Sequence, residues 1–215
     1  MWLFEKVLDG NMYYAEKKIE NNYLFDESKL PKFLSAVRQK TLQRELNFQG
    51  IGLHTGNIVS MTLSPAPPET GIVFRRKLKN KTISIQAKYN NVKSTKLCTL
   101  ISDSEGNTIS TVEHILSALY ALEVDNVYID LNSNEVPVYD GSSAEFVKKI
   151  NQFGLDEQEF FKKFIKIKKN VEITNGDKQA RVSPFDNTLI TTKINYHHKL
   201  IGKQSISLLL TPKIY

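Results

Sequence analysis

The chain has 215 residues, of which 40% are hydrophobic and 24% charged, with 10 glycines and 7 prolines. This composition is typical of a globular protein and excludes a disordered, collagenous or low-complexity chain. No run of about 18 consecutive apolar residues is present, so we expect no stable membrane insertion. A single cysteine, Cys98, excludes a disulfide framework and a cysteine-only zinc cluster. We therefore expect a soluble, cytoplasmic protein of one large domain or two small ones.

Positive charge is concentrated in the C-terminal quarter. The formal net charge is +6, and residues 160–215 contain 11 basic and 3 acidic side chains. A solvated basic strand face explains this surplus as well as an anionic ligand such as a phosphate ester does. We expect no nucleic-acid partner, because the sequence has no zinc-finger, RNP-type or helix-turn-helix spacing.

The first 38 residues form an N-terminal extension to which we assign no role. Met12, Tyr13, Ile19 and Tyr23 recur at helical spacing, which predicts one or two short helices before Pro31.

Strands are expected from Thr41 onward. A glycine-rich turn over 50–56 separates the first of them from a strand over 58–63. Further short apolar runs predict strands at 72–74, 83–85 and 97–101.

Two helices and one strand follow. Ser110 and Glu113 have capping-box spacing, which predicts a helix over 111–122 with an apolar stripe. A strand is expected over 126–131. A second helix over 144–153 is expected to stop at Gly154.

The remaining segments predict strands at 164–168, 171–174, 179–182 and 189–196. Strands, then helices, then strands indicate an α+β protein with two-layer sheet/helix domains. We place the domains at 39–158 and 159–215, with the boundary near 155–161, where the charge balance changes. The first domain is expected to be complete and the second partial.

Glu113 and His114 are the two residues whose chemistry most clearly suits a catalytic site. Adjacent residues of a helix project about 100° apart, so both side chains can face a site at the helix start. A neutral imidazole can bind zinc, and a neighbouring carboxylate can take a proton from water. The capping box explains Glu113 equally well, and a single helical histidine is more often structural than a ligand.

Four other features were considered for both chemical and structural roles. His54 lies in the glycine-rich turn, where backbone can approach a ligand, yet a turn histidine can simply bind local carbonyls. Cys98 is expected in a strand as a small buried residue rather than a nucleophile. Asp140-Gly141-Ser142 suits an anion or metal loop and equally a plain turn. His197 and His198 are expected on a strand, where adjacent side chains point to opposite faces and cannot chelate one ion.

The order of the motifs is more specific than any one of them. They are Gly50-Ile-Gly-Leu-His-Thr-Gly56, Pro65-Ala-Pro-Pro-Glu-Thr-Gly-Ile-Val-Phe-Arg-Arg76, Leu97-Cys-Thr-Leu100, Ser110-Thr-Val-Glu-His-Ile-Leu-Ser-Ala-Leu119, Val124-Asp-Asn126 and Glu135-Val-Pro-Val-Tyr-Asp-Gly-Ser-Ser143. From about Gln39 to about Ser207, the chain closely resembles the zinc-dependent UDP-3-O-acyl-N-acetylglucosamine deacetylases of lipid A biosynthesis in Gram-negative bacteria.

The resemblance implies a fold, a reaction and site residues. The fold would be two similar α+β domains, with their helices packed between the sheets and the active site between the domains. The reaction would be hydrolysis of the N-acetyl group of a UDP-linked, 3-O-acylated glucosamine, the committed step of this lipopolysaccharide pathway. Glu113 matches the general base and His114 a zinc ligand. His54 and Cys98 match positions that line the pocket, and Lys178 matches a lysine near the nucleotide.

The family pattern also includes residues that these 215 do not contain. The resemblance implies two more zinc ligands from a His-Lys-x-x-Asp segment and a histidine as general acid, and neither is present. We therefore expect a C-terminally truncated enzyme. The alternative is a non-catalytic remnant that at most binds a UDP-sugar, or that needs a separately encoded C-terminal half.

Overall fold

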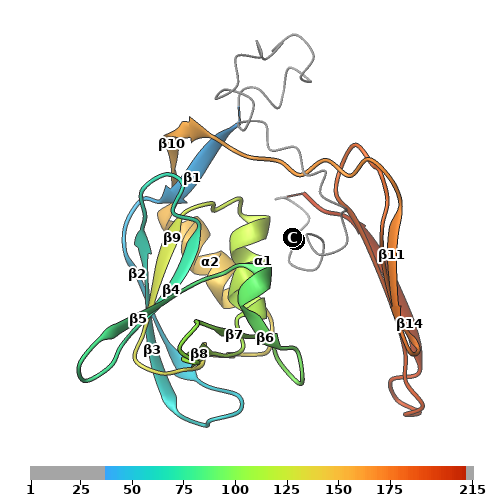
Figure 1. Ribbon diagram of the computed structural model, residues 1–215, viewed down its shortest axis with the longest axis horizontal. Helices are drawn as coiled ribbons and strands as arrows, with labels where there is room; N and C mark the ends of the chain where they lie inside the picture. The colour runs from blue at the N-terminus through green and yellow to red at the C-terminus, as the bar shows by residue number, and fades with distance from the viewer. Residues whose placement is uncertain (1–36, 212–215) are drawn as a thin grey trace. The chain divides into compact units, whose positions relative to one another are not determined.

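The computed structural model describes residues 37–211. Within this range the chain divides into two compact units, 37–163 and 164–211, which are treated separately below. The helices expected between Met12 and Pro31 lie outside the described residues. Figure 1 shows both units with their helices and strands labelled.

The first unit is built on a five-stranded sheet. All its neighbouring strands are antiparallel except β9 and β4, which run parallel. Across the sheet the strands are β2 (Leu46–Ile51), β3 (Ile58–Pro65), β9 (Val127–Leu131), β4 (Ile72–Lys77) and β5 (Thr82–Gln86).

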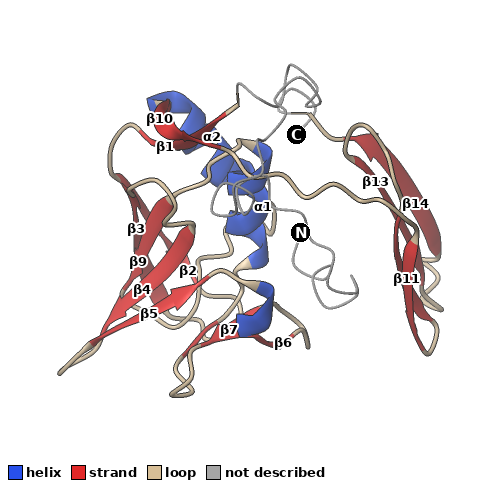
Figure 2. Cartoon of the chain, turned by 45° about the horizontal axis from the view of Figure 1, so that its top comes forward, coloured by secondary structure: helices blue, strands red, loops and turns tan. Residues whose placement is uncertain are grey.

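Side-chain alternation explains why these strands bury one face. In β9, Val127, Ile129 and Leu131 are buried, whereas the two residues between them are half-buried. Successive side chains of a strand point to opposite faces, so the buried set lies on one side of the sheet. Figures 1 and 2 show α1 (Glu113–Ala121) and α2 (Ala144–Phe153) covering one side of the sheet. Sheet and helices share one hydrophobic core.

Both helices were predicted, with different accuracy at their ends. Helix α2 has the predicted bounds, and Gly154 terminates it with a φ of +84°. Glycine adopts this left-handed conformation without the steric penalty of a Cβ atom. Helix α1 begins two residues later than the capping box predicts, for a reason described with the candidate site.

A small antiparallel sheet contains β6 (Val92–Ser94), β7 (Leu100–Ser102) and β8 (Thr108–Ile109), and the 3-10 helix η2 (Tyr89–Asn91) precedes it. The predicted strand over 97–101 is wrong in its first half. Leu97 has a φ of +66°, which a strand cannot accommodate, so β7 begins only at Leu100.

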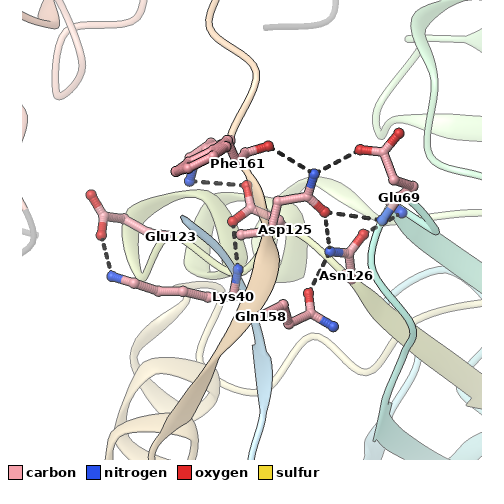
Figure 3. Close-up of polar contacts among 10 residues, drawn as sticks. Lys40, Glu69, Glu123, Asp125, Asn126, Gln158 and Phe161 are labelled. Carbon is pink, nitrogen blue, oxygen red and sulfur yellow. Dashed lines mark hydrogen bonds and ion pairs between the residues drawn. The ribbon is translucent and has the colours of Figure 1, made fainter. Parts of the chain in front are cut away.

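Strand β1 (Arg38–Leu42) pairs with β10 (Leu155–Phe161) in a two-stranded ribbon. The buried amide of Asn126 joins this ribbon to the rest of the first unit (Figure 3). Its Nδ2 donates to Oε1 of Gln39 at 2.8 Å and to Oε1 of Gln158 at 2.7 Å. Its Oδ1 accepts the N–H of Gly71 at 2.8 Å.

Ion pairs surround this amide cluster and connect the same elements (Figure 3). The pairs are Lys40 with Glu123 at 2.7 Å, Lys162 with Asp125 at 3.0 Å and Lys163 with Glu69 at 2.7 Å. The β1–β10 ribbon therefore attaches to the rest of the first unit through polar contacts as well as through its apolar residues.

The second unit consists of two β-hairpins. They pair β11 (Val171–Asn175) with β12 (Lys178–Val182), and β13 (Leu189–Asn195) with β14 (Lys203–Leu209).

Three of the predictions for this unit differ from the structure. Residues 164–168 form no strand, and β14 was not predicted. His197 and His198 lie in the turn between β13 and β14 rather than on a strand, because β13 ends at Asn195.

The predicted α+β class is confirmed by the arrangement of sheets and helices. Among residues 37–211, no helix is long and apolar enough to cross a membrane.

The core position of Ile129 gives a direct test of the packing. Ile129 is fully buried, whereas Ile58 is 67% exposed. We expect Ile129→Val to lower the free energy of unfolding by about 1 kcal/mol, because it removes a buried methyl group and leaves a small cavity. The same change at Ile58 should alter it by less than about 0.5 kcal/mol. Urea denaturation measures both, and an equal loss at the two positions would contradict this packing.

Candidate functional site

Glu113 and His114 occupy the first two positions of α1, and both side chains are half-buried. Glu113 Oε2 accepts the backbone N–H of Thr99 at 3.0 Å, which links the helix start to the loop before β7. Among the described residues, no hydrogen-bond partner is found for the other carboxylate oxygen, Oε1. The loop before β7 thus fixes one oxygen of this carboxylate.

The predicted capping box is wrong. The residue that caps α1 is Val112, with no side-chain hydrogen bond to the helix. The hydroxyl of Ser110 instead donates to the carbonyl of Asn134 at 3.2 Å. Thr111 has a φ of +61°, so the helix cannot include it. Glu113 therefore does not serve as the capping-box acid that its spacing suggested.

His54 lies in the turn between β2 and β3, and its side chain is exposed. Its backbone N–H donates to Glu135 Oε1 at 2.9 Å, and the N–H of Thr55 donates to Oε2 at 2.9 Å. The Thr55 hydroxyl also donates to Oε2, at 2.7 Å. One carboxylate from a distant part of the sequence therefore binds two adjacent residues of the turn, His54 and Thr55.

The same carboxylate also binds the segment that leads into α1. The Thr111 hydroxyl donates to Glu135 Oε1 at 3.1 Å. The side chain of Glu135 is completely buried. Burial alone would raise the pKa of this carboxyl group, but the hydrogen bonds from His54, Thr55 and Thr111 lower its pKa below the ordinary value. Our sequence analysis did not single out Glu135, because a glutamate in a proline-containing turn normally indicates an exposed residue.

The lowered pKa of Glu135 predicts a pH-dependent contribution to stability. A carboxyl group with a depressed folded-state pKa stabilises the fold above its unfolded pKa, near 4.3, and loses this contribution as the pH falls through the folded value. We expect Glu135→Gln to be less stable than wild type at pH 7, and the difference to shrink below about pH 4.3. Chemical denaturation across this pH range measures it. Glu157→Gln, at an exposed position on β10, is the control; a gap that stays constant with pH would contradict the prediction.

Cys98 is half-buried in the loop between β6 and β7, which corrects the predicted strand position. It precedes Thr99, whose N–H binds Glu113, so its loop lies beside the start of α1. Asp140 lies within electrostatic range of His114. Hydrogen bonds from Ser142 chiefly lower the pKa of Asp140, and an electrostatic contribution from His114 lowers it further.

Lys178 is the first residue of β12, opposite Asn175 in the hairpin, and its side chain is exposed. It belongs to the second unit, whereas the other four predicted site residues belong to the first. Within the first unit, hydrogen bonds of Glu113 and Glu135 connect the segments that carry Glu113, His114, His54 and Cys98.

A known protein family matches most of the chain. The family model described as UDP-3-O-acyl N-acetylglycosamine deacetylase matches residues 39–215. The chain belongs to this family.

Curated deacetylases of the family give the extent of the similarity. The UDP-3-O-acyl-N-acetylglucosamine deacetylase of Histophilus somni (strain 129Pt) is 40% identical over 167 residues, which cover 78% of this chain and 55% of the relative. Its counterpart in Idiomarina loihiensis is 42% identical over 166 residues, covering 77% and 54%. In Pseudomonas entomophila (strain L48) the values are 41% over 171 residues, 80% and 56%. The chain thus spans about half the length of the curated relatives it matches.

The resemblance to the deacetylases implies a zinc ion, which needs ligands from protein side chains. A catalytic zinc site usually takes three protein ligands and keeps one position open. Within residues 37–211, no group of three or more His, Cys, Asp or Glu side chains could hold a metal ion. The described residues therefore do not form a complete zinc site, although His114 is suitable as one ligand of such a site.

Proposed function

We propose that this chain takes part in the hydrolysis of the N-acetyl group of UDP-3-O-acyl-N-acetylglucosamine, which gives UDP-3-O-acylglucosamine and acetate. This would be the committed step of lipid A biosynthesis in a Gram-negative bacterium, and it would take place in the cytoplasm. The observation that carries the proposal is the Glu113–His114 pair at the start of α1, in a chain whose family membership extends over residues 39–215.

Glu113 is the proposed general base. Amide hydrolysis needs a group that removes a proton from the attacking water, and a carboxylate within hydrogen-bond reach of that water can do this. Thr99 fixes one oxygen of Glu113 through its N–H, which leaves Oε1 to approach the water. His54 and Cys98 are proposed to line the pocket for the sugar, and Lys178 to bind the anionic nucleotide.

His114 is the proposed metal ligand. Zn²⁺ would act as a Lewis acid toward the amide carbonyl when it is bound. The described residues do not complete a site for it. The remaining ligands, and an acid that protonates the departing amine, would have to come from residues outside 37–211 or from a second polypeptide.

A non-catalytic role is the second candidate, and one observation favours it. Among the described residues, no group of three or more His, Cys, Asp or Glu side chains could hold a metal ion. In that case the chain would at most bind a UDP-sugar, and its basic C-terminal quarter would supply the positive charge for the diphosphate.

Two measurements on the purified 215-residue chain separate these candidates. Elemental analysis gives the zinc content per chain, and an acetate-release assay with UDP-3-O-acyl-N-acetylglucosamine gives the rate. One zinc per chain together with acetate release would support the deacetylase. Binding of UDP without zinc or acetate release would support the non-catalytic candidate and overturn the catalytic one.

A further inference from the structure

The carboxylate of Glu135 has every acceptor position occupied. Oε1 receives the N–H of His54 at 2.9 Å and the hydroxyl of Thr111 at 3.1 Å. Oε2 receives the N–H and the hydroxyl of Thr55, at 2.9 and 2.7 Å. A carboxylate with two hydrogen bonds on each oxygen suits a buried charge, because every desolvated lone-pair position is compensated.

Gly52 shows how closely the turn encloses this carboxylate. A Cβ atom at position 52 would lie 2.4 Å from Glu135 Oε2 and 2.5 Å from the Thr55 hydroxyl oxygen. Side chains do not approach this closely, so only glycine permits the contact. The turn that carries His54 is therefore shaped around Glu135.

The hydrogen bond from Thr111 to Glu135 holds a residue whose backbone conformation is unfavourable. A φ of +61° is rare for a β-branched residue. The backbone of the preceding residue is fixed as well: Ser110 N–H donates to the Asn134 carbonyl at 2.9 Å, and Val136 N–H donates to the Ser110 carbonyl at 3.1 Å. Such conformations persist where surrounding contacts impose them, and they often occur at functional sites. Only Val112 separates Thr111 from Glu113.

We propose that Glu135 is a positioning residue that holds the His54 turn and the Glu113–His114 start of α1 in one fixed arrangement. This inference rests on the proposed deacetylase function. Glu135 acts through other residues: its oxygens are occupied by protein donors, and the groups that it orients are the ones proposed to meet the substrate.

Glu135→Gln in the full chain tests the arrangement without an assay of activity. A glutamine presents one oxygen and one NH₂ group, so at least one of the donors from His54, Thr55 and Thr111 loses its acceptor. We expect hydrogen exchange at the His54 and Thr55 amides, followed by NMR, to become about 10- to 100-fold faster. Exchange at Ile129, in the central strand β9, should become faster only by the factor that the measured loss of global stability gives. An increase at the His54 and Thr55 amides no larger than the increase at Ile129 would overturn the proposal.

The control is Glu123→Gln, which makes the same chemical change at a partly exposed glutamate paired with Lys40. It should leave exchange at His54 and Thr55 unchanged. Thr111→Val removes only the hydroxyl that links Glu135 to α1 and keeps the branched shape, so it replaces Glu135→Gln if that variant does not fold.

Acetate release by the zinc-loaded chain tests the consequence for catalysis. We expect Glu135→Gln to lower kcat/KM about 10- to 100-fold at a temperature where the variant is fully folded, and Thr111→Val to lower it several-fold. A rate that survives both changes within twofold would overturn the role of Glu135 while leaving the deacetylase intact. A wild-type chain without turnover would overturn deacetylation by this chain alone, and the role of Glu135 in it.

Discussion

Replacing Asn126 with alanine is expected to lower the free energy of unfolding by about 3 kcal/mol. The change removes the acceptor of the Gly71 N–H and the donor to Gln158 Oε1, and it takes one of two donors from Gln39 Oε1. Each buried polar group left without a partner costs about 1–3 kcal/mol. Asn126 is itself buried, so water cannot easily replace the lost contacts.

Urea or guanidinium denaturation of the full chain measures this loss. The matched control is Asn47→Ala, because Asn47 is exposed and accepts one hydrogen bond from the Thr62 hydroxyl. That change should alter the free energy of unfolding by less than about 0.5 kcal/mol. Asn126→Asp separates hydrogen bonding from packing. It keeps the size of the side chain but directs a carboxylate oxygen at Gln39 and Gln158, so it should be at least as destabilising as alanine.

If Asn126→Ala and Asn47→Ala proved equally mild, the cluster in Figure 3 would not hold the β1–β10 ribbon to the rest of the first unit. The ion pairs around the cluster would be too weak to hold the ribbon in its place. Partly exposed pairs such as Lys163 with Glu69 contribute at most about 1 kcal/mol each.

Much of the fold follows from local patterns in the sequence. The alternation in β9 is contained within a few residues, and Gly154 ends α2 by its own conformational freedom. These elements need no knowledge of distant partners. The sequence therefore predicts them correctly, with bounds close to the observed ones.

The errors occur where a distant residue decides the local conformation. Ser110 has the spacing of a helix cap, but its hydroxyl binds Asn134, 24 residues further along the chain. Strand β10 contains four charged or polar side chains among its seven residues and has no clear alternation, yet it pairs with β1 more than 100 residues earlier. Residues 164–168 alternate as a strand does and find no partner within the described chain.

In the candidate site too, residues with a local sequence signal could be predicted and residues that depend on distant partners could not. Glu113 and His114 could be selected because their helix start and the order of the motifs are visible in the sequence. Glu135 could not, because its significance comes from partners 81 and 24 residues away that burial brings to one carboxylate. A glutamate next to a proline turn carries no local sign that it is buried.

The second large effect is expected at Glu113. Glu113→Gln should lower kcat for acetate release by the zinc-loaded chain about 10²- to 10⁴-fold, the usual contribution of a general base. Glutamine has the same size and can still accept the Thr99 N–H, but it cannot take a proton from water. We therefore expect the free energy of unfolding to stay within about 0.5 kcal/mol of wild type.

His114→Ala distinguishes loss of the base from loss of the metal. Glu113→Gln should retain zinc and lose the rate, whereas His114→Ala should lose both, because an imidazole ligand is removed. His197→Ala, in the turn between β13 and β14, changes the same residue type at an exposed position of the second unit and should leave zinc content and rate unchanged.

The size of the residual rate provides the decisive comparison. If Glu113 accepts the proton, Glu113→Gln loses most of the rate, because an amide cannot take a proton from water. A variant that kept more than about a tenth of the wild-type rate would contradict the assignment. Glu113 would then be a structural residue whose main contact is the Thr99 N–H, and the base would have to be sought among other carboxylates near α1, beginning with Asp140, which lies within electrostatic range of His114.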